Sequence, residues 1–300
     1  METIKNFDQL IAHLRSRGER KTVAVVWGED ESSQEAILSA LEEKIINAVF
    51  VGAVDAVRAN EQLMSHAGNI DFVETNDKDE AARLAVAMVR EGKADILMKG
   101  LINTDNLLHA VLNKETGILP KGTVLTHFTV AKIPTYEKLL VFTDAAVIPY
   151  PTQAQRAEQV RKAVGICHAL GIEEPRVSLI HCSEKVNEKF FPHTVGYQEI
   201  ITAARKGEYG SCIVDGPLDV KVSCCRESAI TKGITSEVAG EADALIFPDI
   251  ESGNTFYKTI TLFCKADTAG ILHGAIAPVV LPSRSDSKTC KLYSLALAAL

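Results

Sequence analysis

The stretch that decides the fold runs Thr22-Val23-Ala24-Val25-Val26-Trp27-Gly28. Before its glycine it is a short apolar run rich in β-branched side chains, which is typical of a strand buried on both faces of a parallel sheet. Gly28 ends the run. Ser32, with Glu35 three residues later, has the pattern of a capping box before a helix that extends through Glu42. This part of the chain is therefore predicted to form a strand followed by a helix.

The same unit recurs along the chain. After a strand at 48–52, Asp77 can cap a helix with Glu80 at its third position, and Gly92 can end that helix. The further predicted strands are short and apolar: 94–98, 139–143, 176–180, 212–214, 244–247 and 278–281. Helical patterns lie between them, including 153–170 and the closing 288–300. This alternation predicts an α/β protein with a mostly parallel sheet.

Size and composition are those of an ordinary globular protein, with 46% apolar and 24% charged residues. A length of 300 residues makes two domains the first expectation and one large domain the alternative. We find no repeat or flexible linker, so two domains would pack closely, with a cleft between them as the natural ligand site. No apolar run reaches the roughly 18 residues that span a bilayer. Residues 1–8 lack the pattern of a signal peptide, so we expect a cytoplasmic protein.

The net charge and the cysteines exclude some classes of function. A formal charge of −7 argues against general nucleic-acid binding, which needs a basic surface. A small polyanionic ligand stays compatible with it, because a few local cations can hold one. Seven scattered cysteines indicate reduced thiols rather than a disulfide framework or a zinc site.

Four polar segments follow apolar strands at their carboxyl ends, the edge where open α/β sheets bind ligands. In the first, 98–104, Gly100 allows a tight turn that leaves Lys99 beside free backbone N–H groups at a helix start, which favours anions. The alternative is a plain turn with a solvated lysine. The second, 214–218, contains Asp215 beside a glycine and a proline, a composition that also suits an ordinary turn.

The third segment, 247–258, is denser in polar groups than a structural turn needs. It offers two carboxylates, a glycine, an amide and a lysine: Asp249, Glu251, Gly253, Asn254 and Lys258. Paired acids are also compatible with Mg²⁺, although no clear third carboxylate ligand is present elsewhere. We interpret the segment as functional.

The fourth segment, 281–291, opens the closing helix with three serines, an arginine and an aspartate. Arg284, Lys288 and Lys291 have the spacing of one helical face, so a phosphate cradle is one interpretation. A serine-capped helix with a solvated basic face is the other. Among the eight histidines only His127 stands out, and a lone histidine is more often packed than catalytic.

Several common catalytic motifs do not occur: Gly-x-Ser-x-Gly, the Walker sequence, Gly-x-Gly-x-x-Gly and His-Glu-x-x-His. Their absence argues against serine hydrolases, P-loop NTPases, typical nucleotide-dependent dehydrogenases and zinc proteases. The order and spacing of six stretches instead resemble the phosphate acetyl/butyryl transferase family, from about residue 20 to the end. These stretches are 94–100, 142–146, 214–218, 236–240, 253–258 and 283–284. The first and the last, with the residues that follow the last, look more like the butyryl branch than the acetyl branch.

The resemblance implies two doubly wound α/β domains with a cleft between them, similar to isocitrate and isopropylmalate dehydrogenases. Domain one would comprise 1–138 plus 285–300, and 139–284 would form the inserted domain two. It also implies a homodimer and the reaction acyl-CoA plus phosphate in equilibrium with acyl phosphate plus CoA, without metal or redox cofactor. The substrates would be a CoA thioester, phosphate and acyl phosphate, with no nucleic-acid or membrane partner.

The resemblance also assigns roles to residues. Ser283 would donate to the sulfur or the oxyanion, and Arg284 would grip phosphate bidentately. The acetyl branch has an aspartate seven residues after this serine as the base for the CoA thiol, but here that position is Cys290. Either Asp286 replaces it, or the local positive field selects the thiolate. The substrate-binding candidates are Lys99, Gly100, Thr104, His127, Asp215, Gly253, Asn254 and Lys258.

Two other functions stay open. One is a metal- and NAD-dependent decarboxylating dehydrogenase of similar architecture. The other is a non-catalytic sensor of CoA or acyl-CoA, which the cysteine at position 290 makes a candidate. The length of the acyl chain does not follow from the sequence.

Overall fold

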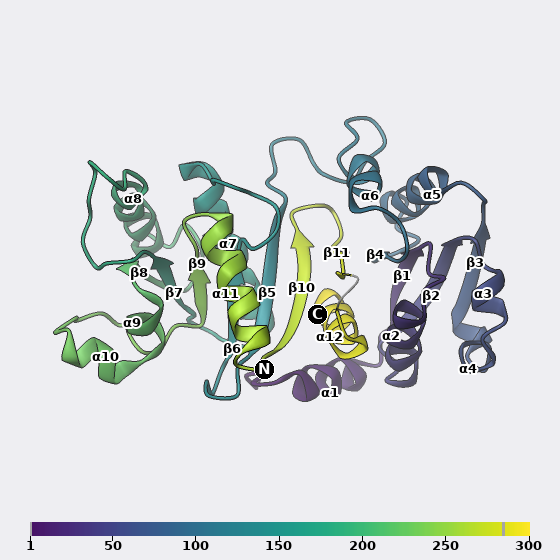
Figure 1. Ribbon diagram of the computed structural model, residues 1–300, viewed down its shortest axis with the longest axis horizontal. Coiled ribbons are helices and arrows are strands. Elements are labelled where there is room, and N and C mark those ends of the chain that lie inside the picture. Colours follow the sequence, from purple (N-terminus) through teal and green to yellow (C-terminus); the bar gives the residue numbers. More distant parts are fainter. Residues whose placement is uncertain (1, 284–285) are drawn as a thin grey trace. The chain divides into compact units, whose positions relative to one another are not determined.

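The computed structural model describes residues 2–283 and 286–300 (Figure 1). These residues form two compact units. Unit 1 contains the first six residues and 126–267, and unit 2 contains 7–125 and 268–300. The sequence suggests boundaries at 138/139 and 284/285, whereas the compact units divide the chain at 125/126 and 267/268. That they are separately folding domains stays a prediction.

Unit 2 is built on a sheet with the strand order β3-β2-β1-β4-β11-β10. Neighbouring strands from β3 to β11 are parallel, and only β10 runs antiparallel to β11. The strands are β1 (Lys21–Val26), β2 (Ile46–Gly52), β3 (Ile70–Glu74), β4 (Ile96–Lys99), β10 (Asp267–His273) and β11 (Val279–Val280). The side chains of residues 23–26 are fully buried, which confirms the central parallel strand predicted there.

The helices of unit 2 follow its strands in the order expected for an α/β fold. They are α1 (Phe7–Arg17), α2 (Glu31–Glu42), α3 (Asp55–Arg58), α4 (Glu61–Met64), α5 (Lys78–Arg90), α6 (Thr104–Val111) and α12 (Lys288–Ala298), with the 3₁₀ turn η1 (Ala67–Asn69). α5 packs on β1 and β2, and α12 packs on α2 and α1. Figure 1 shows the yellow C-terminal helix beside the purple first helix, where the rings of Phe7 and Tyr293 stack with centroids 4.2 Å apart.

The N-terminal caps of α5 and α2 can be compared with those predicted from the sequence. Asp77 caps α5 by accepting the Glu80 N–H at 2.7 Å, as predicted. The cap predicted for α2 was wrong by two residues. Asp30, rather than Ser32, accepts the Ser33 N–H at 2.9 Å, so the helix begins at Glu31. An aspartate two residues earlier competes successfully for the same orphan N–H groups.

Unit 1 has a sheet with the order β5-β6-β9-β7-β8. β6, β9, β7 and β8 are parallel, and β5 is antiparallel to β6. The strands are β5 (Thr126–Lys132), β6 (Leu139–Thr143), β7 (Arg176–Ile180), β8 (Ile213–Leu218) and β9 (Ala244–Ile246). The helices are α7 (Gln153–Ala169), α8 (His193–Arg205), α9 (Val220–Cys224), α10 (Arg226–Thr231) and α11 (Ile250–Leu262). α7 covers β6, β7 and β9, and α8 packs against β8.

Both units are therefore open, mostly parallel sheets connected by helices, which confirms the predicted fold class. In the described part of the chain, no helix is both long and apolar enough to cross a membrane.

Candidate active site

The central strands of unit 2 end side by side. β1, β4 and β11 are adjacent and parallel, and Met98 pairs with Val25 on one side and Val280 on the other. Their carboxyl ends therefore meet at one edge of the sheet, and the loops that follow them lie together. Two of these loops carry Lys99 and Ser283, which the sequence analysis places in the same site.

Lys99 is the last residue of β4 and is 7% exposed. Its ammonium donates to the Gly100 carbonyl at 3.3 Å. Gly100 is required by close packing, because a Cβ there would overlap the Trp27 carbonyl oxygen at the end of β1. The Leu101 N–H donates to this same oxygen at 2.7 Å. Thr104 opens α6 and is exposed. The turn after β4 thus leads from a buried lysine directly to a helix N-terminus.

Two hydrogen bonds link Ser283 and Asp286 after β11. The Ser283 N–H donates to Asp286 Oδ2 at 2.7 Å, and the Asp286 N–H donates to the Ser283 carbonyl at 3.1 Å. Ser287 then caps α12 by accepting the Cys290 N–H at 3.1 Å. The two hydrogen bonds between Ser283 and Asp286 hold the carboxylate of Asp286 beside the backbone of Ser283. Arg284 lies outside the described residues.

The thiol of Cys290 lies within the first turn of α12, 3.6 Å from the Thr268 hydroxyl. Burial raises its pKa to about 11, and the negative charge of Asp286 adds to the shift. The thiol is therefore neutral at pH 7. Cys290 does not replace the missing aspartate as a base.

The predicted basic face of α12 was wrong at one residue. The helix begins at Lys288, so the helical spacing counted from residue 284 does not apply. Lys288 is exposed, but Lys291 is 3% exposed and contacts the N-terminus of α2. It is a buried structural cation rather than part of a solvated cradle.

In unit 1, the carboxyl end of β6 meets the start of β5, because these strands are antiparallel. Asp144 follows β6 and is 2% exposed. Its carboxylate accepts hydrogen bonds from five donors: the backbone N–H groups of His127, Ala146, Val147 and Ile148 and the hydroxyl of Thr126. Asp144 thus fixes the position of His127 and the loop after β6. The sequence analysis did not single it out, although a carboxylate directly after a buried strand is a usable signal.

The first turns of α11 pack against this same loop. A Cβ on Gly253 would overlap the Asp144 carbonyl oxygen, and the Asn254 amide donates to the Ala145 carbonyl at 2.9 Å. Lys258 lies one helical turn further on, and its ammonium is 4.9 Å from the centre of the Tyr257 ring. The structure therefore brings His127, Gly253 and Asn254 together.

Asp249 and Glu251, the acidic pair that suggested Mg²⁺, accept hydrogen bonds from protein donors. Asp249 caps α11 by accepting the Ser252 N–H at 2.8 Å, and Glu251 accepts the Tyr150 hydroxyl at 2.7 Å. Within residues 2–283 and 286–300, no group of three or more His, Cys, Asp or Glu side chains is arranged to hold a metal ion.

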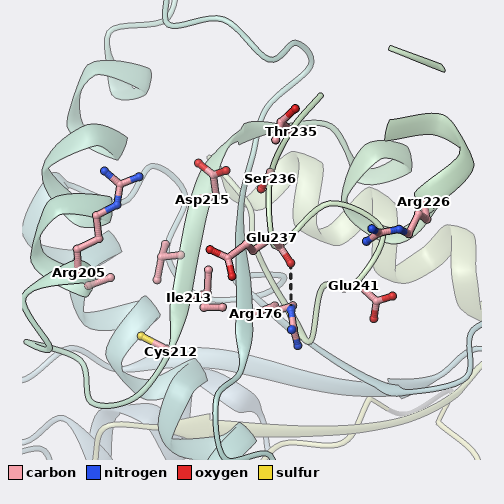
Figure 2. Close-up of a pocket in the computed structure, with 12 residues that line it drawn as sticks. Arg176, Arg205, Cys212, Ile213, Asp215, Arg226, Thr235, Ser236, Glu237 and Glu241 are labelled. Atoms are coloured by element: carbon pink, nitrogen blue, oxygen red, sulfur yellow. Dashed lines mark hydrogen bonds between the residues drawn. The ribbon is translucent and has the colours of Figure 1, made fainter. Parts of the chain in front are cut away.

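Asp215 lies apart from the other candidates of unit 1. It is on β8, which is separated from β6 by the two strands β9 and β7, and its carboxylate accepts the Gly216 N–H at 2.8 Å. It lines a pocket of about 730 Å³ near the amino ends of β7 and β8, together with Arg176. In Figure 2, Arg176 donates to the Glu237 carbonyl, at 3.0 Å. This pocket is at the opposite end of the strands from Asp144.

Comparisons with known proteins identify the family of this chain. Residues 70–299 match the model of the family described as "Phosphate acetyl/butaryl transferase". The chain is 39% identical to the phosphate butyryltransferase of Clostridium acetobutylicum, over 99% of this chain and 98% of that protein. A branched-chain phosphotransacylase from Enterococcus faecalis V583 has a similar structure, with a TM-score of 0.81 and 31% identity, covering 93% of this chain and 97% of that one.

A putative 4-hydroxythreonine-4-phosphate dehydrogenase from Salmonella typhimurium, at 14% identity and a TM-score of 0.55, shares the fold alone, over 94% of this chain and 100% of that one. The match over nearly the whole length of a transferase relative decides the family. This chain belongs to the phosphate acetyl/butyryl transferase family.

Proposed function

We propose that this protein transfers a butyryl or similar short acyl group between CoA and inorganic phosphate: acyl-CoA plus phosphate gives acyl phosphate plus CoA. The observation that carries the proposal is the position of Lys99 and Ser283 at the carboxyl ends of the adjacent strands β4 and β11. The match to a phosphate butyryltransferase along the whole chain supports the choice of acyl group.

The reaction needs stabilisation of a tetrahedral oxyanion and of a thiolate leaving group. We assign the hydroxyl of Ser283 as the donor to the sulfur or the oxyanion. Lys99 is a buried cation one strand away, and with Thr104 at a helix start it suits the phosphate oxygens. Arg284, by its chemistry, would grip phosphate through two parallel N–H donors.

In the direction of CoA attack, a base assists the loss of the thiol proton. A thiol with a pKa of about 8.5 is only a few per cent ionised at pH 7. We assign this role to Asp286, because its carboxylate lies beside the Ser283 backbone and the neutral thiol of Cys290 is a poor proton acceptor. Selection of the thiolate by the positive charges of this region is the competing account.

Unit 1 supplies the remaining candidates. We propose that Asn254, Lys258 and His127 contact the CoA thioester or the acyl phosphate, with Gly253 allowing the close approach of α11 to the loop after β6. Asp215 is the weakest member of this set because it lies at a separate pocket. We further propose that the enzyme is a cytoplasmic homodimer that needs no metal or redox cofactor.

One assay tests the proposal and its rivals. CoA release is followed with DTNB from acetyl-, propionyl-, butyryl- and isobutyryl-CoA, with and without phosphate. We expect phosphate-dependent release that is fastest with butyryl- or isobutyryl-CoA. Binding of these thioesters without turnover would support the sensor instead. Turnover that requires NAD and Mg²⁺ would support the dehydrogenase.

A further inference from the structure

One buried ammonium group joins the starts of two helices in unit 2. Lys291, in the first turn of α12, is 3% exposed. Its Nζ lies 2.6 Å from the hydroxyl of Ser32, 3.3 Å from that of Ser33 and 3.3 Å from Asp30 Oδ1. These three residues form the N-terminus of α2, directly after the loop that leaves β1. Lys291 therefore connects α12 with the carboxyl edge of the sheet.

A buried lysine destabilises the fold unless its charge is paired and its N–H groups are hydrogen-bonded, so the position of the Lys291 ammonium is tightly constrained. Burial alone would raise the pKa of Asp30, but hydrogen bonds from Ser33 and Ser32 and the charge of Lys291 hold it below its ordinary value. Asp30 is therefore a carboxylate at neutral pH. An ammonium that faces one carboxylate and two hydroxyls cannot follow a shift of α12 relative to α2 without losing a partner.

The connection continues from Lys291 to the candidate catalytic groups. The Lys291 N–H donates to the Ser287 carbonyl at 3.1 Å, and the Ser287 side chain caps the helix. Asp286 directly precedes this cap and is linked to Ser283 by two hydrogen bonds. A movement of the first turn of α12 would thus move the hydroxyl of Ser283 and the carboxylate of Asp286.

We propose that Lys291 is a positioning residue for acyl transfer, which holds Ser283 and Asp286 in place by tying the start of α12 to the start of α2. It touches no substrate itself. The kinetic part of this inference rests on the proposed function. A displacement of about 1 Å of a catalytic group can cost about a hundredfold in rate, so the contact has a measurable consequence.

The test is Lys291→Met, which keeps much of the volume and removes the charge. We expect kcat to fall at least about tenfold, while the KM values for acyl-CoA and phosphate change less than about threefold, because only the position of reacting groups is lost. The matched control is Lys162→Met. Lys162 is a lysine 9% exposed on α7 of unit 1, paired with Glu158 at 3.2 Å. It should lose stability without this change in kcat.

A second readout does not depend on activity. The rate of Cys290 alkylation by iodoacetamide, measured by peptide mass spectrometry, reports on the first turn of α12. In Lys291→Met we expect it to rise at least about tenfold, because local opening exposes the thiol. Cys167 on α7, which is fully buried in unit 1, is the internal reference and should keep its rate. Equal increases at both thiols, or no increase at Cys290, would overturn the proposal.

A milder variant covers the case in which Lys291→Met does not fold. Ser32→Ala removes the shortest hydrogen bond and leaves Asp30 opposite the ammonium. It should lower kcat and raise Cys290 reactivity in the same directions by about threefold. Wild-type values of both would also overturn the proposal. If the wild-type protein releases no CoA, the proposed function is wrong, and the alkylation rates still decide the role of Lys291.

Discussion

Several carboxylates of this protein are engaged by the fold, and their partners decide which of them is left for chemistry. Asp144 accepts five hydrogen bonds, Asp30 caps a helix and faces a lysine, and Asp249 caps α11. Among the described residues, Asp286 accepts the Ser283 N–H through Oδ2. It is also the carboxylate nearest in sequence to Ser283. Because Ser287 is the cap of α12, a carboxylate in that position suits either a base or a structural role that holds the Ser283 backbone.

A substitution separates these two roles of Asp286. We expect Asp286→Asn to lower kcat for acyl phosphate plus CoA at least about tenfold at pH 7. The loss should be smaller at pH 9, where CoA ionises without help. Cys290→Ser should change kcat only slightly, because the thiol is neutral. The measurement is the pH profile of kcat from pH 6 to 9, with the melting temperature of each variant.

A purely structural role of Asp286, in holding the Ser283 backbone, would give another result. The Asn variant would then lose thermal stability and show no recovery at pH 9. Full activity of Asp286→Asn at pH 7 would exclude the base, and selection of the thiolate by local positive charge would become the leading account.

At the scale of elements, α8 carries a histidine whose environment favours the neutral form. Burial lowers the pKa of His193 to about 4, and the positive charges of Arg156 and His181 add to the effect, while Asp249 opposes it. The ring packs against those of His181, Phe191 and Tyr197. Protonation is thus unfavourable in the folded state.

This shift predicts a pH dependence of stability. The unfolded chain binds a proton at His193 below about pH 6.5, whereas the folded protein does so only near pH 4. The unfolding free energy contributed by His193 is therefore full above pH 6.5 and is lost as pH falls toward 4. We expect the melting temperature of wild type to fall more steeply from pH 7 to 4.5 than that of His193→Gln. His109→Gln, at an exposed position of α6, should follow wild type, and parallel curves for all three would contradict the prediction.

The elements that could be predicted from sequence are those with an unbroken apolar signal. β1, β6 and β7 appear within one residue of their predicted ends, because runs such as 23–26 are buried on both faces. β5 was not predicted. Thr126 and Thr129 are fully buried in it, so their polar side chains hide the strand from a hydrophobic pattern. The cap of α2 was predicted two residues too late, because the neighbouring Asp30 competes with Ser32 for the same N–H groups.

The candidate site divides in the same way. Lys99, Ser283 and Asn254 were predicted as site residues because polar groups follow strands at a ligand-binding edge, and their roles stay predictions. Lys291 was placed on a basic helical face, either in a phosphate cradle or solvated, and its burial was missed because it depends on the start of α2, more than 250 residues away. Asp215 follows the same pattern as the others, yet it lies at another pocket. Local spacing indicates which residues are candidates for a site, but it does not indicate which of them lie close together in the fold.

At the scale of the whole molecule, we predict that the reaction needs no metal ion. A similar fold occurs in a putative dehydrogenase, whereas the family relatives are phosphate acyltransferases. We expect acyl transfer to be unchanged after EDTA treatment and dialysis, because Asp249 and Glu251 already serve protein donors. Turnover is measured by CoA release before and after dialysis. A loss that Mg²⁺ restores would contradict this prediction and would favour the metal-dependent reaction.

The two ends of the described chain are anchored in different units. Near the start, Ile4 donates its N–H to the Leu170 carbonyl of unit 1, at 2.9 Å, whereas α12 and Leu300 belong to unit 2. A donor fluorophore attached at residue 2 would therefore label unit 1, and an acceptor at residue 300 would label unit 2. Energy transfer between the ends would follow any opening or closing motion during turnover, with no label placed near the chemistry.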